Sequence, residues 1–148
     1  MGLVERLTLG STAGIDASVF VYHLEEHPVY IGLTNEILGA VESGRFRAVT
    51  SSLTLLETAT RPYRLDQAWV ARKYEALLAN FPNLRIQAID RDVARRAAQL
   101  RARFGLHPAD ALQAAACLWA GAEAIITNNR ALECLQELCK VILLDDCL

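Results

Sequence analysis

Three acidic residues lie in apolar stretches of the sequence, where an isolated carboxylate is costly to bury. Asp16 ends a short apolar run, Glu57 follows two leucines, and Asp110 is the only charged residue in the apolar segment around it. If the fold brings the three together, their repulsion raises their pKa values unless a cation compensates. Clustered carboxylate oxygens are the ligands that Mg²⁺ and Mn²⁺ favour. The three acids therefore predict a divalent-metal site.

A structural role accounts for each acid taken singly, because carboxylates also cap helices and pair with arginine. For Asp16 and Glu57 the structural and functional roles stay equally open. Asp110 falls in the first turn of a helix that begins near Pro108, where the helix dipole favours an anion, and this position favours a capping role. Only the meeting of all three acids in one pocket separates the two hypotheses.

The segment after Asp110 predicts a packed helix, a buried strand and polar residues at the carboxyl end of that strand. Residues 111–119 are apolar on nearly every face, which is typical of a helix packed on most sides, and Gly121 closes that helix. A buried strand is predicted over 124–127, and residues 128–130 (Asn-Asn-Arg) follow at its carboxyl end. Ligands bind at that edge in open α/β sheets.

Strand and helix patterns alternate along the rest of the chain. Strands are predicted over 13–16, 45–50, 84–89, 124–127 and 141–144, and helices over about 33–43, 52–61, 66–80, 91–103, 108–120 and 133–138. Residues 18–24 fit either a continued strand or a helix capped by Ser18. The alternation predicts an α/β fold with a mainly parallel sheet and helices on both faces.

Length and composition predict one domain over residues 1–148. The chain is 53% apolar and contains no linker, repeat or low-complexity run. Residues 1–12 are weakly patterned and are expected to be a weakly ordered leader or an edge strand. No function is assigned to that segment.

The charge balance excludes a protein with an overall basic field. Net charge is −2, yet all basic residues except Lys73 and Lys140 are arginines, which bind phosphate bidentately. The arginine-rich helix face over 91–103 is typical of a solvated surface and could also follow RNA phosphates.

Cysteine spacing and hydropathy favour a soluble cytoplasmic protein. The four cysteines form no CxxC pair and have no histidine at zinc spacing, so reduced, mostly packed thiols are expected. No apolar run approaches the roughly 20 residues of a membrane span, and no secretory signal is evident.

The acidic motifs, taken in order, resemble the PIN domain family and, within it, the VapC-type toxins. The matching stretches are Gly14-Ile15-Asp16-Ala17-Ser18, Thr50-Ser51-Ser52-Leu53-Thr54-Leu55-Leu56-Glu57, and Ala109-Asp110-Ala111-Leu112-Gln113-Ala114-Ala115, with Thr127-Asn128-Asn129-Arg130 downstream. The resemblance implies a three-layer α/β/α sandwich and an Mg²⁺- or Mn²⁺-dependent endoribonuclease. It makes Asp16, Glu57 and Asp110 the metal-binding acids. It also implies a homodimer and a small antitoxin as partners.

The chain departs from the family pattern at Asn129, where family members commonly have aspartate. An amide oxygen can still ligate a hard metal or hold a water, so Asn129 is predicted to be a fourth catalytic residue, with Thr127 helping to position the metal shell. Losing the charge lowers the expected metal affinity. Glu133, Asp145 or Asp146 could compensate, although their positions are typical of a solvated surface. The alternative function is a PIN-like domain that binds RNA or a protein without cutting.

The predicted reaction is hydrolysis of an RNA phosphodiester bond. It needs no histidine, and His23, His27 and His107 are interpreted as loop or helix-flank residues. A phosphoacceptor receiver domain is disfavoured, because the chain lacks paired early acids and a late strand-end lysine. The candidate partner surfaces, which core packing explains equally well, lie around Tyr22 and Tyr30 and around Trp69 and Tyr74.

Overall fold

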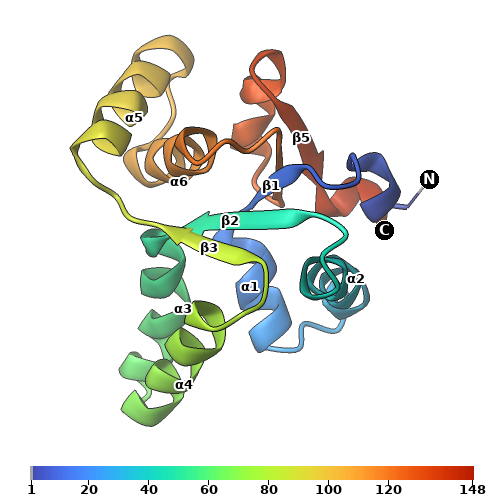
Figure 1. Cartoon of the computed structure of the whole chain (residues 1–148). Helices are drawn as coiled ribbons and strands as arrows, with labels where there is room; N and C mark the ends of the chain where they lie inside the picture. The colour runs from blue at the N-terminus through green and yellow to red at the C-terminus, as the bar shows by residue number, and fades with distance from the viewer. Residues whose placement is uncertain (1) are drawn as a thin grey trace.

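A five-stranded parallel sheet forms the centre of the structure, a computed structural model that describes residues 2–148 (Figure 1). The strands are β1 (Thr12–Ile15), β2 (Arg47–Ser51), β3 (Leu84–Gln87), β4 (Ala124–Thr127) and β5 (Lys140–Leu143). Their order is β3-β2-β1-β4-β5, and every neighbouring pair is parallel. The chain winds away from β1 in both directions, so the switch point of the sheet lies between β1 and β4.

Helices cover both faces of the sheet, which confirms the predicted α/β/α sandwich. One face carries α1 (Ala17–Leu24), α2 (Ile31–Glu42), α3 (Ser52–Arg64) and α4 (Ala68–Ala79), drawn below the sheet in Figure 1. The other face carries α5 (Arg91–Phe104) and α6 (Pro108–Trp119), drawn above it. Three 3₁₀ segments complete the chain: η1 (Val4–Arg6), η2 (Arg130–Glu137) and η3 (Leu144–Cys147).

Side chains of the sheet alternate between two hydrophobic cores. Ile15 and Ile126 point into the core shared with α1 and α2, whereas Val49 and Ile125 point into the core shared with α5 and α6. All four are almost fully buried. Because both faces are covered, the strands are apolar on both sides, as is usual in parallel sheets.

Gly14 allows α6 to approach β1 closely. A Cβ atom at Gly14 would lie 2.7 Å from the Cβ and 2.8 Å from the Sγ of Cys117, a fully buried residue of α6. No real Cβ tolerates such contacts, so a side chain here would push the helix that carries Asp110 away from the sheet.

Gly14→Ala is therefore expected to lower the free energy of unfolding by about 1–3 kcal/mol, the usual cost of overpacking a core. Urea denaturation of the purified protein measures this change. The matched control is Gly39→Ala in α2, where an added Cβ meets nothing within 4 Å. That control should be neutral or stabilising, because alanine favours a helix interior. Equal stability of the two variants would contradict the close-packing argument.

The structure decides two alternatives near the start of the chain. Residues 2–11 form no edge strand; η1 forms there, and Leu3 and Val4 are buried in the core beside α2. Residues 17–24 form helix α1, and its N-cap is Asp16 rather than Ser18.

Two predicted element boundaries are also wrong. The helix predicted over 52–61 continues through Pro62 to Arg64 as α3, and it ends where Asp66 takes a positive φ of 58°. A proline near a helix end removes only one hydrogen bond, which this short continuation tolerates. The helix predicted over 133–138 is the 3₁₀ segment η2, which begins earlier, where Asn129 accepts a hydrogen bond from the backbone of Ala131.

All four cysteines are free, as expected, and Cys117 is buried. Burial raises the pKa of the Cys117 thiol far above its ordinary value, which makes it a packing residue rather than a nucleophile. Between residues 2 and 148, no helix combines the length and apolarity needed to cross a bilayer.

Candidate metal site at the carboxyl edge of the sheet

Asp16 lies at the switch point, directly after β1, and its carboxylate is held from two sides. One oxygen, Oδ1, accepts a hydrogen bond from the backbone of Ala17 at 2.9 Å and thereby caps α1. The other, Oδ2, accepts from Thr127 Oγ1 at 2.7 Å and from Ser18 Oγ at 3.3 Å. Thr127 ends β4, so the two central strands jointly orient the Asp16 carboxylate.

The electrostatic environment opposes ionisation of Asp16. Burial raises the pKa of this carboxyl group, hydrogen bonds from Thr127, Ala17 and Ser18 lower it, and the nearby Asp110 raises it again, with a net upward shift. Sequence reasoning missed the hydroxyl of Ser18 as a partner and treated it only as a possible helix cap. A nearby cation would favour the ionised form of this desolvated carboxylate.

Asp110 lies in the first turn of α6, as predicted, but it makes no capping hydrogen bond within residues 2–148. The N-cap position belongs to His107, whose side chain does not cap the helix. The Asp110 Oδ1 atom instead accepts a hydrogen bond from Asn129 Nδ2 at 2.9 Å. The capping role favoured by its position is therefore wrong, and the carboxylate faces the end of β4.

Glu57 lies in α3, and the charges of Asp16 and Asp110 act on its carboxyl group. Its pKa is raised first by partial burial of the carboxyl group and then by the charges of Asp16 and Asp110, although much of the residue is exposed. Within residues 2–148 its carboxylate has no hydrogen-bond or ion-pair partner, so no protein group offsets that repulsion. Asp16 and Asp110 therefore lie near enough to Glu57 for their charges to act on it.

The side-chain amide nitrogen of Asn129 contacts the Asp110 carboxylate at this edge of the sheet. Its Nδ2 donates to Asp110, while its Oδ1 accepts from the backbone of Ala131 at 3.0 Å and caps η2. The backbone N–H of Asn129 donates to Thr127 Oγ1 at 2.9 Å. In this arrangement Asn129 supports the Asp110 carboxylate by hydrogen bonding.

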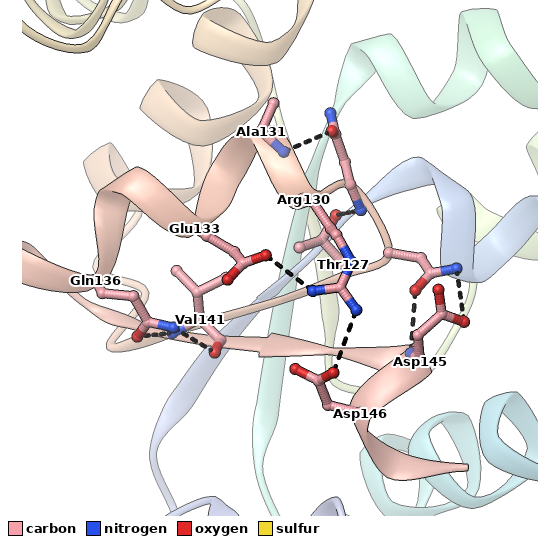
Figure 2. Close-up of polar contacts among 10 residues, drawn as sticks. Thr127, Arg130, Ala131, Glu133, Gln136, Val141, Asp145 and Asp146 are labelled. Atoms are coloured by element: carbon pink, nitrogen blue, oxygen red, sulfur yellow. Dashed lines mark hydrogen bonds and ion pairs between the residues drawn. The ribbon is translucent and has the colours of Figure 1, made fainter.

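Nearby acids that could replace the missing charge at position 129 are engaged elsewhere. Figure 2 shows the Arg130 guanidinium between Glu133, at 3.0 Å, and Asp146, at 3.3 Å. Asp145 accepts a hydrogen bond from Tyr30 Oη at 2.5 Å. Glu133, Asp145 and Asp146 therefore belong to surface contacts beside η2 and η3, as their sequence positions suggested.

The chemistry of the donors fits a hydrated Mg²⁺ or Mn²⁺ ion. Among residues 2–148, no three His, Cys, Asp or Glu side chains are close enough to ligate one ion directly. Mg²⁺, however, keeps several waters and is usually bound through one or two carboxylates. Asp16 and Asp110 supply hard oxygens, and Glu57 adds a third negative charge that is coupled to both of them. A divalent cation relieves the repulsion that raises the pKa values of Asp16 and Glu57.

Glu57→Gln is expected to stabilise the metal-free protein at neutral pH. The folded protein raises the pKa of Glu57 above the ordinary value of 4.5, so it binds this proton more tightly than the unfolded chain does. The resulting stability is fully present below about pH 4.5 and is lost as the pH rises through the folded pKa. The glutamine variant avoids that loss, so its advantage should grow from acidic to neutral pH.

Urea denaturation in a chelating buffer at about pH 4 and about pH 7.5 measures this difference. Adding Mg²⁺ at neutral pH should stabilise the wild type more than Glu57→Gln. A variant that is less stable than the wild type in neutral chelating buffer would show that Glu57 is not repelled by its neighbours.

The remaining sequence candidates lie away from the three acids or are already paired. In α5, Arg95 pairs with Asp92 at 2.9 Å and Arg103 pairs with Glu137 at 2.8 Å. The rings of Tyr22 and Tyr30 stack on each other, with centroids 4.3 Å apart, and pack against the core. A phosphate-binding role for the α5 face stays a prediction.

Comparisons with known proteins agree with this architecture. The family model described as PIN domain matches residues 14–138. VapBC-1 from nontypeable Haemophilus influenzae is similar in structure, with a TM-score of 0.66 and 16% identity, over 90% of this chain and 98% of that one. A toxin–antitoxin complex from Klebsiella pneumoniae has a TM-score of 0.64 and 19% identity, over 89% and 97% of the two chains.

A third similar structure is VapC20 of Mycobacterium tuberculosis, a sarcin–ricin-loop-cleaving toxin. Its TM-score is 0.61 at 17% identity, over 76% of this chain and 86% of that one. At such identities the likeness establishes a shared fold.

No curated protein sequence matches the chain significantly. The family model covers most of the sequence and all four motifs at the sheet edge, and the chain therefore belongs to the PIN domain family.

Proposed function

We propose that the protein is a divalent-metal-dependent endoribonuclease that acts as the VapC-like toxin of a toxin–antitoxin pair. The observation that carries the proposal is the convergence of Asp16, Glu57 and Asp110. They come from three distant parts of the sequence, yet the charge of Asp110 raises the pKa of Asp16, and the charges of Asp16 and Asp110 raise the pKa of Glu57. Membership of the PIN domain family and the fold shared with VapC proteins support a nuclease.

The three acids would divide the work of holding Mg²⁺ or Mn²⁺. Asp16, fixed by Thr127, and Asp110, fixed by Asn129, present oxygens whose directions are set by hydrogen bonds. Glu57 has no such partner among residues 2–148, so its carboxylate is free to hold and deprotonate a water. When bound, the ion lowers the pKa of a water and neutralises charge on the phosphate. The residues themselves supply orientation and the proton acceptor.

The test is incubation of structured RNA with the purified protein in Mg²⁺, in Mn²⁺ and in chelator. We expect cleavage with either ion, none in chelator, and recovery when the ion is restored. Cleavage that survives chelation would contradict the metal-dependent mechanism. Absence of cleavage at every metal concentration would favour the second candidate function, binding without cleavage, which the amide at Asn129 motivates.

An antitoxin protein and a second copy of the chain are the proposed partners, and the cytoplasm is the proposed location. Several similar structures are VapBC or other toxin–antitoxin complexes, which supports an antitoxin. Large exposed apolar side chains on and beside α3 and α4 are typical of an interaction surface: Leu56, Tyr63, Leu65, Trp69 and Leu77. Light scattering measures the molar mass of the isolated protein, and we expect the mass of two chains.

A further inference from the structure

A buried polar network connects the helix that carries Asp110 with the helix that carries Glu57. Gln113, one turn after Asp110 on α6, is only 5% exposed. It meets three hydroxyl groups that are fully buried: Thr50 and Ser51 at the end of β2, and Thr54 in the first turn of α3. Thr54 lies one turn before Glu57, so the network joins the two helix faces that carry the acids.

The hydrogen bonds fix the orientation of the Gln113 amide. Ser51 Oγ already accepts from the backbone of Leu53 at 3.2 Å, so its hydroxyl proton is free to donate to Gln113 Oε1. The Gln113 Nε2 group then donates to Thr50 Oγ1 at 3.3 Å and Thr54 Oγ1 at 3.2 Å. The two threonine hydroxyls bond to each other at 2.6 Å. Both ends of the amide are thus used.

Packing alone does not require this arrangement. The rest of the α6 surface that meets the sheet is alanine and cysteine, and an apolar side chain of similar size would fill the same space. A buried polar network is costly unless every member is satisfied, and when satisfied it selects one geometry. Between residues 2 and 148 no buried side-chain polar atom lacks a partner. The network therefore specifies how α6 sits against α3.

We infer that Gln113 is a positioning residue that fixes the separation between the carboxylates of Asp110 and Glu57. It touches neither carboxylate, and acts by locking α6 to the end of β2 and the start of α3. This inference rests on the proposed function insofar as it concerns metal binding. The locking of the two helices is a property of the metal-free protein and is testable without any ion.

The test compares Gln113→Met with the wild type by isothermal titration with Mn²⁺. We expect Gln113→Met to bind Mn²⁺ about 10-fold more weakly, because residues that support metal ligands usually contribute 10–100-fold to affinity. The control is Gln136→Met, at an exposed glutamine. The Gln136 amide also makes two hydrogen bonds, to Val141 N and O, both at 3.1 Å, but it joins η2 to β5 (Figure 2). Its loss should lower stability without changing Mn²⁺ affinity.

A double-mutant cycle separates positioning from general destabilisation. If Gln113 acts through Thr54, the effects of Gln113→Met and Thr54→Val on Mn²⁺ affinity should be non-additive, whereas Gln136→Met and Thr54→Val should add. Equal Mn²⁺ affinity of Gln113→Met and wild type would overturn the inference. If Gln113→Met does not fold, Ser51→Ala and Thr54→Val each remove part of the network and should each weaken binding.

Hydrogen exchange distinguishes failure of this inference from failure of the proposed function. If the wild type binds no Mn²⁺, the metal-dependent function fails, and exchange in the metal-free protein decides the positioning role. Gln113→Met should then speed exchange in the first two turns of α3 and the first turn of α6, with no such change in Gln136→Met. Unchanged exchange in those turns would overturn the positioning role.

Discussion

Asp16→Asn is expected to reduce RNA cleavage by about a thousandfold, the scale on which loss of a preorganised electrostatic group acts. Asparagine keeps the shape of the side chain and can still accept the hydrogen bond that caps α1. It removes the negative charge at the point where the two central strands meet. The loss should therefore appear as weaker metal binding and slower cleavage, while the fold is retained.

Asp90→Asn is the matched control. Asp90 also caps a helix, since its Oδ1 accepts from the backbone of Val93 at 3.0 Å, but that helix is α5, outside the acidic site. Both variants exchange a capping carboxylate for an amide, and only Asp16→Asn should lose activity. Circular dichroism confirms that both are folded. An active Asp16→Asn protein would remove Asp16 from the site.

Asn129→Asp is expected to raise the affinity for Mg²⁺ about tenfold, because the number of charged ligands sets affinity for a hard cation. The new carboxylate would replace the amide nitrogen that lies 2.9 Å from Asp110 Oδ1. Without metal this places two acids in direct contact, which should cost about 1–3 kcal/mol of stability at neutral pH. Mg²⁺ should reverse that loss. Thermal denaturation across a range of Mg²⁺ concentrations measures both effects.

Asn128→Asp provides a control that adds the same charge one residue earlier. The amide of Asn128 points to Tyr22 Oη, at 3.3 Å, and to Asp145, at 3.5 Å, rather than to Asp110. It should not increase Mg²⁺ affinity by the same factor. Equal gains in the two variants would mean that bulk charge, not a fourth ligand position, controls binding.

The sequence allowed the parallel sheet, and the positions of Asp16 and Asn129 at its carboxyl edge, to be predicted because both depend on local patterns. Short apolar runs followed by polar residues marked the carboxyl ends of β1 and β4, and parallel strands bring such ends to one edge. The role of Asp16 as the cap of α1 was harder to predict. Ser18 is also a good capping residue, and the tertiary hydrogen bond from Thr127 that holds the Asp16 carboxylate in place has no local signal.

The direction of side chains could not be predicted from the sequence. Position alone suggested that Asp110 caps its helix, but the amide of Asn129, which lies close only in the folded chain, accounts for its orientation. The leader illustrates the same limit, since Leu3 and Val4 are buried by contacts with α2 that no local pattern reveals. Gln113 is a polar residue in an otherwise apolar helix, and this alone could have marked it as unusual. Its hydrogen-bond partners could not be predicted, because they lie more than fifty positions away in the sequence.

Diffraction from crystals grown with Mn²⁺, recorded at a wavelength where manganese scatters anomalously, tests the shared metal site most directly. We expect an anomalous peak bounded by the carboxylates of Asp16, Glu57 and Asp110, contacted directly or through water, and no peak there in Asp16→Asn. A peak at another surface, or none where millimolar Mn²⁺ is present, would contradict it.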